Sequence, residues 1–269
     1  MKKDELLVDM PVETIADYQI SAKTIQVCLS EIVTWIRYGD SSKYFVCANP
    51  HALEVARIDK VFEEALRAAD LVIPDGMGIV IASRILGGSI QKRITGSDLF
   101  LGLSRLLADD TSRTYRYYFL GSTEDNLEKI RQRIAADFPN LLVCGTYSPP
   151  FRDEFSEEEK RLMVEAVNNA EPDVLWVGMT APKQEKWIYQ NRNRVNVKFI
   201  GAIGAVFDFY TGNVKRSHPL FQKLGIEWLP RFLREPRRLW YRNFVSNPSF
   251  LLRVIKCRLT DTNKTIDQI

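Results

Sequence analysis

Polar side chains that could bind or activate a ligand follow four apolar segments of this 269-residue chain. Asn49 follows the segment 44–48, Asp75 follows 71–73, Gln184 follows 174–178, and Asp208 follows 197–203. A carboxylate held at a cleft can take a proton from a hydroxyl group, and polar groups at the start of a helix can bind a phosphate or a sugar hydroxyl. The four residues therefore indicate a site that acts on a hydroxyl group or a phosphate.

Each of these residues also has a structural interpretation. Asp75 precedes Gly76 in a strand-to-helix turn, so it is either a general base or the N-cap of the next helix. Asn49 either caps a helix or contacts a ligand. Gln184 starts a helix after Pro182, where it either contacts a ligand or belongs to a solvated first turn.

Other residues near these segments carry weaker signals. Gly76 is consistent with a backbone N–H group directed at a phosphate, but the G-x-G-x-x-G fingerprint of dinucleotide-binding folds is incomplete here. Arg93 is either a solvated loop residue or a second group at the same edge. His51 and His218 are the only histidines, and their separation does not suggest a triad or a metal site. Because residues 1–212 contain no D-x-D motif, we expect a site without metal or cofactor.

Alternating strands and helices must position these residues. The pattern predicts strands at 44–48, 71–73, 115–120, 141–145, 174–178 and 197–203. Helical patterns lie between them, at 50–69, 76–86, 97–108, 124–138, 157–170 and 183–194. Such alternation predicts an α/β fold with a parallel sheet covered by helices on both faces. Ligands of these folds bind beyond the carboxyl ends of the strands, which is where the four polar residues fall.

The composition divides the chain near residue 212. Residues 213–269 hold twelve basic and four acidic residues mixed with large aromatic side chains, whereas residues 1–212 hold 25 basic and 30 acidic residues. We predict an α/β core at 1–212 and a basic, aromatic appendage at 213–269, which four prolines cut into short helices. Positive charge with aromatics suits an anionic membrane surface, and its confinement to one segment argues against a nucleic-acid partner.

Four scattered cysteines and the apolar runs of the chain bear on its location. The cysteines form no C-x-x-C pair, which favours a reducing cytosol. The first residues lack the apolar core of a signal peptide, and the longest apolar run, 199–207, is too short to span a bilayer. We therefore expect a cytoplasmic protein that binds the inner face of the plasma membrane peripherally. The sequence does not indicate an oligomeric state.

Several strings taken together resemble a known family, the WecG/TagA/CpsF glycosyltransferases (glycosyltransferase family 26). The resemblance runs, in the family's order, from about Phe45 to Arg253, and it includes Asn49 with its downstream helix. The strings are ADLVIPDGMGIV (69–80), RITGSDL (93–99), FLGS (119–122), VGMTAPKQEKWI (177–188), GAIGAVFDFYTGNVKR (201–216) and GIEWLPRFLREPRRLWYR (225–242).

The resemblance implies a fold and an activity. It implies a Rossmann-like α/β core of the GT-E type whose C-terminal appendage reaches the membrane and completes the active site. Members transfer a sugar from a UDP-sugar to a saccharide on a membrane-embedded polyprenyl diphosphate, with inversion at the anomeric carbon. They serve the synthesis of bacterial cell-surface polysaccharides. An N-acetylmannosamine-type donor is favoured slightly, and a glucose-type donor for exopolysaccharide assembly stays open.

The resemblance also assigns residues. The family's candidate general base matches Asp75, and its active-site Asn, Arg and Gln match Asn49, Arg93 and Gln184. Its nucleotide-contacting Asp matches Asp208. The appendage arginines that align best are Arg231 and Arg238, which we expect to stabilise the departing UDP.

Cys47 departs from the family pattern, because Thr is common two residues before the Asn. A thiol donates hydrogen bonds poorly, so the contact that the Thr hydroxyl makes is in doubt here. The sequence argues against two other classes of protein. A nicotinamide-dependent oxidoreductase would need a complete glycine fingerprint, which is absent. A non-catalytic membrane adaptor would have no need for Asp75, Arg93 and Gln184 at one sheet edge.

Overall fold

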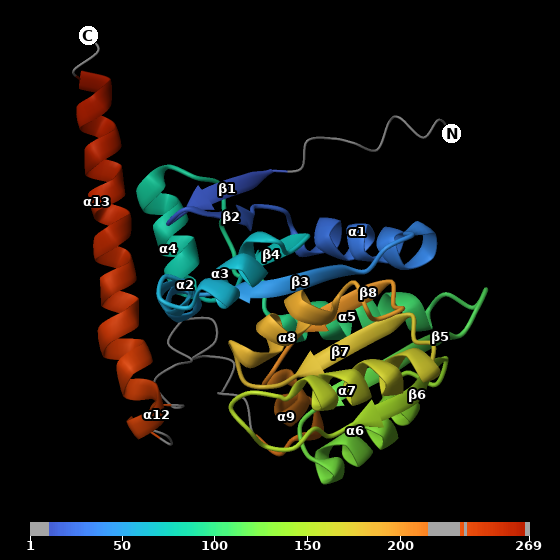
Figure 1. Cartoon of the computed structure of the whole chain (residues 1–269). Coiled ribbons are helices and arrows are strands. Elements are labelled where there is room, and N and C mark those ends of the chain that lie inside the picture. The colour runs from blue at the N-terminus through green and yellow to red at the C-terminus, as the bar shows by residue number, and fades with distance from the viewer. Residues whose placement is uncertain (1–10, 215–231, 234–235, 267–269) are drawn as a thin grey trace.

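The computed structural model describes residues 11–214, 232–233 and 236–266, and Figure 1 gives its arrangement. A six-stranded sheet lies at its centre, with the order β4-β3-β8-β7-β5-β6 and parallel pairing throughout. Its strands are β3 (Lys43–Ala48), β4 (Leu71–Pro74), β5 (Tyr115–Gly121), β6 (Leu141–Tyr147), β7 (Val174–Gly178) and β8 (Phe199–Ala202). The six strands predicted from the sequence are therefore confirmed, and their apolar character follows from burial on both faces.

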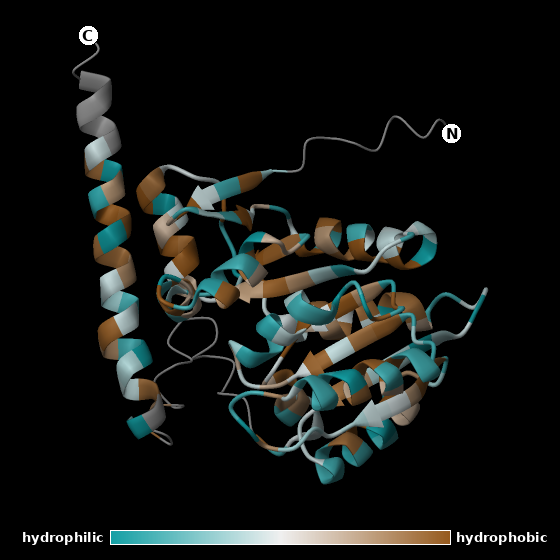
Figure 2. Cartoon of the chain, viewed as in Figure 1, coloured by the Kyte–Doolittle hydropathy of each residue, from teal (hydrophilic) through white to brown (hydrophobic). Residues whose placement is uncertain are grey.

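Helices cover both faces of this sheet and make an α/β fold of three layers. One layer contains α2 (Pro50–Ala56), α3 (Lys60–Arg67), α4 (Met77–Leu86), α7 (Glu157–Asn169) and α8 (Lys183–Asn191). The other contains α1 (Ile25–Tyr38), α5 (Gly96–Ala108), α6 (Glu124–Asp137) and α9 (Val206–Thr211). Figure 2 shows the strands largely hydrophobic and the outer sides of α6 and α7 hydrophilic. The core is thus two apolar layers, one on each side of the sheet.

The helix that follows β8 lies on the opposite face of the sheet from the helices that follow its neighbours β3 and β7. After β3 and β7 the chain continues into α2 and α8 on one face, whereas after β8 it continues into α9 on the other. Neighbouring strands whose following helices diverge leave a crevice at their carboxyl ends, and ligands of open α/β sheets bind in such crevices. The fold therefore predicts a binding site at the ends of β3, β8 and β7.

The N-terminal part and one helix differ from the sequence-based expectations. A small antiparallel hairpin, β1 (Val12–Ile15) and β2 (Tyr18–Ser21), and helix α1 precede the sheet, and the sequence analysis assigned neither. The helix expected at 50–69 is two helices, because the side chain of Asp59 accepts a hydrogen bond from Phe62 N and starts α3 as its N-cap. The predicted caps Thr123 and Ser156 are confirmed, the latter in a capping box with Glu159.

The described part of the appendage consists of α12 (Pro236–Tyr241), a π-helical turn η1 (Arg242–Ser246) and α13 (Asn247–Ile266). The expectation that Pro248 ends a short helix is wrong. It lies at the second position of the 20-residue helix α13, directly after the π-helical turn η1. Pro219 and Pro230 lie outside the described residues. No helix in the described part of the chain has the length and apolar character needed to cross a membrane.

Helix α13 packs against α4 and α2, with Phe250 and Val254 in the core on that side of the sheet. Figure 1 shows it on the side toward which the arrows of β3 and β7 point. The appendage therefore lies next to the carboxyl ends of the strands, where the predicted site residues begin.

Candidate active site

Asn49 and Asp75 lie side by side at the ends of β3 and β4. Ala48 pairs with Pro74 across the two strands, and the backbone N–H of Asp75 donates to the carbonyl of Ala48 at 2.8 Å. The side-chain oxygen of Asn49 accepts from Ala52 N at 3.0 Å and caps α2, which leaves its amide nitrogen outside the cap. Asn49 is therefore an N-cap that also lies at the expected edge of the site.

The cap interpretation of Asp75 is wrong. Helix α4 begins at Met77 with Gly76 as its N-cap residue, and no side chain caps it. Gly76 has φ +109°, a conformation that side chains rarely adopt, and it lies against Asn49: a Cβ added to it would be 3.9 Å from the Cβ of Asn49. The half-buried Asp75 therefore lies in the turn that directly precedes the first backbone N–H groups of α4.

The loop that carries Arg93 is bonded to the turn of Asp75. The N–H of Ile94 donates to the carbonyl of Pro74 at 2.9 Å, so the loop that carries Arg93 is fixed to the residue before Asp75. The Arg93 side chain is half-buried rather than fully solvated. The backbone of Arg93 therefore lies next to the strand end that carries Asp75.

Cys47 is the last residue of β3 whose side chain points to the face of the sheet that α5 covers. A Cβ on Gly96 would lie 3.6 Å from its sulfur, and the sulfur is 4.0 Å from the carbonyl oxygen of Ala202. Burial, and next the negative charges of Asp75 and Glu185, raise the pKa of the Cys47 thiol well above its ordinary value. The thiol therefore stays protonated near neutral pH, and both carboxyl groups lie within electrostatic reach of it.

Gln184 is buried at the start of α8, with 5% of its surface exposed, so the interpretation as a solvated first turn is wrong. Its Oε1 accepts from Met179 N at 3.2 Å, and its Nε2 donates to Oε1 of Glu185 at 2.8 Å. The preceding Lys183 is directed elsewhere, because its ammonium group lies over the rings of Phe151 and Phe155. The amide is thus held between the end of β7 and the buried Glu185.

Glu185 is a site residue that the sequence analysis missed. The residue is only 3% exposed, and its Oε2 has no hydrogen-bond partner among the residues that the structure describes. Burial raises the pKa of Glu185 to about 7. The sequence offered no direct signal, since Glu in the first turn of a helix is ordinarily a solvated residue that favours the helix dipole.

Asp208 lies on α9 at the opposite end of the site, next to α6. Its Oδ1 accepts from Nδ2 of Asn126 at 3.0 Å. Asn126 is 1% exposed and also contacts Ser122, Thr211 and Asn213 through its side chain. The sequence analysis did not identify Asn126, because this residue is 82 positions before Asp208. The network fixes the carboxylate of Asp208 at the end of β5 and β8.

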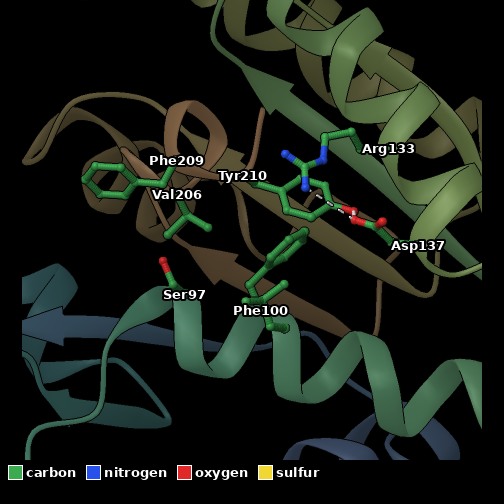
Figure 3. Close-up of a pocket in the computed structure, with 8 residues that line it drawn as sticks. Ser97, Phe100, Arg133, Asp137, Val206, Phe209 and Tyr210 are labelled. Atoms are coloured by element: carbon green, nitrogen blue, oxygen red, sulfur yellow. Dashed lines mark hydrogen bonds and ion pairs between the residues drawn. The ribbon is translucent and has the colours of Figure 1, made fainter. Parts of the chain in front are cut away.

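A cavity of about 220 Å³ opens between α5, α6 and α9 (Figure 3), and none of the predicted site residues lines it. Figure 3 shows the ring of Tyr210 beside Arg133 and Asp137 from α6. The Tyr210 hydroxyl donates to Asp137 Oδ2 at 2.9 Å, and the Arg133 guanidinium lies 4.9 Å from the ring centroid. These polar groups are satisfied by one another, so the cavity has less to offer a ligand than the sheet edge.

The side chains of the two appendage arginines lie outside the described part of the chain. Arg231 lies outside the described residues. Arg238 lies in α12, but its side chain is outside the described part. Among the described residues no group of three His, Cys, Asp or Glu side chains is arranged to hold a metal ion. Of the predicted residues, the structure thus brings Asn49, Cys47, Asp75 and Gly76 together, joins the Arg93 loop to them, and spaces Gln184 and Asp208 along the same edge.

Comparison with known proteins supports a common origin for this arrangement. A sequence model of the Glycosyl transferase WecG/TagA/CpsF family matches residues 13–264. A Bacillus spizizenii protein named N-acetylglucosaminyldiphosphoundecaprenol N-acetyl-beta-D-mannosaminyltransferase is 30% identical over 221 residues, covering 81% of this chain and 82% of the relative. A protein of the same name from Bacillus subtilis is 28% identical over 77% of both chains. Another, from Staphylococcus aureus, is 26% identical over 80% of both chains. The chain belongs to the WecG/TagA/CpsF family of glycosyltransferases.

Proposed function

We propose that this glycosyltransferase moves an N-acetylmannosamine-type sugar from a UDP-sugar to a saccharide carried on a polyprenyl diphosphate. The names of its relatives, which specify an N-acetylmannosamine group and an N-acetylglucosaminyl-diphosphoundecaprenol acceptor, support this choice. The structural observation that carries the proposal is the position of Asp75. It follows β4, an edge strand of the sheet, at the carboxyl ends of the strands and beside Asn49, and Gly76 rather than Asp75 is the N-cap residue of the helix that follows.

The proposed reaction is a single displacement with inversion. Asp75 takes the proton of the acceptor hydroxyl while the hydroxyl oxygen forms a bond to the anomeric carbon. The bond from that carbon to the UDP oxygen breaks, and UDP leaves with the electron pair. A positioned general base contributes about 10²–10⁴-fold to such a step. Asn49, held as the cap of α2, would orient the reacting groups beside the base.

The departing diphosphate gains negative charge and needs donors and cations. The backbone N–H groups at Gly76 and at the start of α4 follow Asp75 directly, and the loop of Arg93 is bonded to the residue before Asp75, so we propose these N–H groups and the Arg93 guanidinium for this task. We propose that Arg231 and Arg238 of the appendage add to them, because a guanidinium binds two phosphate oxygens at once. Gln184 would hold the donor sugar or its phosphate, and Asp208 the uridine portion. We propose that the reaction needs no divalent metal.

The appendage has the composition of a membrane-binding surface. Leu252, Ile255 and Leu259 are 61%, 42% and 60% exposed, and their spacing aligns them on one side of α13, opposite the buried Phe250 and Val254. Trp240 and Phe244 stack at 4.6 Å between ring centroids at the base of this helix. Exposed apolar and aromatic groups among basic residues support peripheral binding to the anionic inner face of the plasma membrane.

Turnover with a lipid-linked acceptor tests the reaction. The wild type, offered UDP-N-acetylmannosamine and a polyprenyl-diphosphate-linked N-acetylglucosamine, is expected to release UDP in the presence of EDTA. Asp75→Asn is expected to bind UDP and to lose turnover by at least 10²-fold. Asp109→Asn, at the exposed end of α5, is the matched control and should behave as the wild type. Normal turnover by Asp75→Asn would rule out the base assignment.

A donor panel and vesicle flotation test the remaining parts. UDP-glucose used in preference to UDP-N-acetylmannosamine would replace the proposed donor by a glucose-type one. The wild type should float with vesicles that contain anionic lipid. A Leu252→Glu, Leu259→Glu variant should not, because it puts two negative charges on the apolar side of α13. Both positions are exposed, so the variant should still fold. Equal flotation of the two proteins would contradict the assignment of α13 to the membrane.

A further inference from the structure

Glu185 is a buried carboxyl group that the proposed reaction leaves without a role. It lies at the end of β7 next to Gln184, with one oxygen bonded to the Gln184 amide and the other without a partner among the described residues. Buried carboxyl groups without a cation are costly and are uncommon in proteins. Its position suggests that the group serves the site rather than the stability of the core.

The contacts of Gln184 fix the orientation of its amide. The backbone N–H of Met179 can only donate, so the atom that faces it must be the amide oxygen. The carboxyl oxygen of Glu185 at 2.8 Å is accordingly an acceptor for the amide nitrogen. Both contacts select the same one of the two amide orientations. Without Glu185, only the single bond to Met179 would hold the side chain.

The remaining face of the amide is directed at the turn after β8. A Cβ on Gly204 would lie 3.3 Å from Oε1 and 3.5 Å from Nε2 of Gln184, and Gly204 has φ +43°. Because Gly204 has no side chain, the Gln184 amide can lie directly against the turn that follows β8, and the hydrogen bonds to Met179 and Glu185 use one lone pair of its oxygen and one of its two N–H groups. Along this edge Gln184 lies between Asp75 at β4 and Asp208 beside β5, which is where the sugar and diphosphate of a donor would lie.

Charged groups on the neighbouring elements do not neutralise Glu185. On its own helix, Lys186 pairs with Asp59 at 3.0 Å and Lys183 donates to the carbonyl of Arg152. From β3, the Cys47 thiol lies within electrostatic reach of Glu185, and the raised pKa of that thiol keeps it neutral. Within the described part of the chain, therefore, no cation pairs with Glu185, and its side chain hydrogen-bonds to Gln184.

We propose that Glu185 is a positioning residue: it holds the Gln184 amide so that its second N–H group binds an acceptor oxygen in the sugar–diphosphate part of the donor. This inference rests on the proposed function, because it takes a UDP-sugar as the ligand of the edge. It assigns Glu185 no contact with the reacting atoms.

Donor affinity, measured by calorimetry without acceptor, tests this proposal separately from turnover. The full-length chain is titrated with UDP, UDP-N-acetylmannosamine and UDP-glucose, and the tightest UDP-sugar is used for the variants. Glu185→Leu is expected to weaken binding at least tenfold, whereas Glu185→Gln, which keeps an acceptor for Gln184, should stay within threefold of the wild type. Gln190→Ala, at an exposed position of the same helix, is the control.

A double-variant cycle separates positioning from a structural role. If Glu185 acts through Gln184, the Gln184→Leu, Glu185→Leu double variant should bind the donor as weakly as Gln184→Leu alone. Multiplicative losses in the double variant, or unchanged affinity in Glu185→Leu, would overturn the proposal. If the wild type bound none of the three nucleotides, the proposed function would fail instead. Thermal melting of each variant checks that the losses occur in folded protein.

Discussion

Replacing Glu185 by Gln should change how the stability of the protein depends on pH. The pKa of this carboxyl group is about 7 in the folded protein, against an ordinary value of 4.5. Between these two values the unfolded chain releases the proton while the folded protein keeps it. The free energy of unfolding therefore falls as the pH rises from about 4.5 through about 7.

The size of this effect follows from the two pKa values. One pKa unit corresponds to about 1.4 kcal/mol, so integration from pH 5 to pH 8 gives a loss of about 2.5 kcal/mol from Glu185 alone. Other groups titrate over the same range, but they are shared with Glu185→Gln. The difference in unfolding free energy between variant and wild type therefore reports the contribution of Glu185 alone. Relative to the wild type, Glu185→Gln should become more stable by about 2.5 kcal/mol on going from pH 5 to pH 8.

Urea denaturation at pH 5, 6, 7 and 8 measures this difference. Glu154→Gln, in an exposed loop, is the control and should parallel the wild type at all four values. A difference between Glu185→Gln and wild type that stays constant within 0.5 kcal/mol, about the error of such fits, would refute the reasoning. It would mean that the carboxyl group is solvated or paired in the folded protein, contrary to the burial described here.

Three further predictions concern the same edge. Gly204→Ala should weaken UDP-sugar binding about as much as Gln184→Leu, measured by calorimetry, because its Cβ would press on the Gln184 amide from a backbone with φ +43°. Asn126→Leu should lower the free energy of unfolding by about 2–4 kcal/mol in urea and weaken UDP binding, because it removes the donor to Asp208 from a buried network. Cys47→Thr should keep turnover, and Cys47 should resist iodoacetamide at pH 7.5, because the raised pKa keeps its thiol protonated.

The sheet was predictable from the sequence because strands buried on both faces are short apolar runs bounded by polar turns. The rule that ligands bind at the carboxyl ends of parallel strands also brought Asn49 and Asp75 to one edge, and their register confirms that they are neighbours. The split of the helix at 50–69 was not foreseen, since it depends on the side chain of Asp59 competing for the backbone.

The roles of polar residues inside the site were less accessible to sequence reasoning. Whether Asp75 caps a helix depends on where α4 starts, and only the fold shows that Gly76 takes that position. Glu185 reads as a solvated residue because its burial depends on packing against strands distant in sequence. The hydrogen bond between Asn126 and Asp208 joins two helices that are far apart in the sequence, and no local sequence pattern predicts that they meet.

Helix α13 rests on the two helices whose first turns adjoin Asn49 and Asp75. Arg253 bonds Glu54 of α2 at 2.8 Å, Ser246 meets the imidazole of His51 at 2.9 Å, and Phe250 is wholly enclosed. Removing the tail would therefore uncover apolar side chains of α2 and α4 as well as removing the proposed membrane contact. A shortened chain that is inactive would report lost folding as readily as lost chemistry, so single substitutions are the means to separate anchoring from catalysis in this protein.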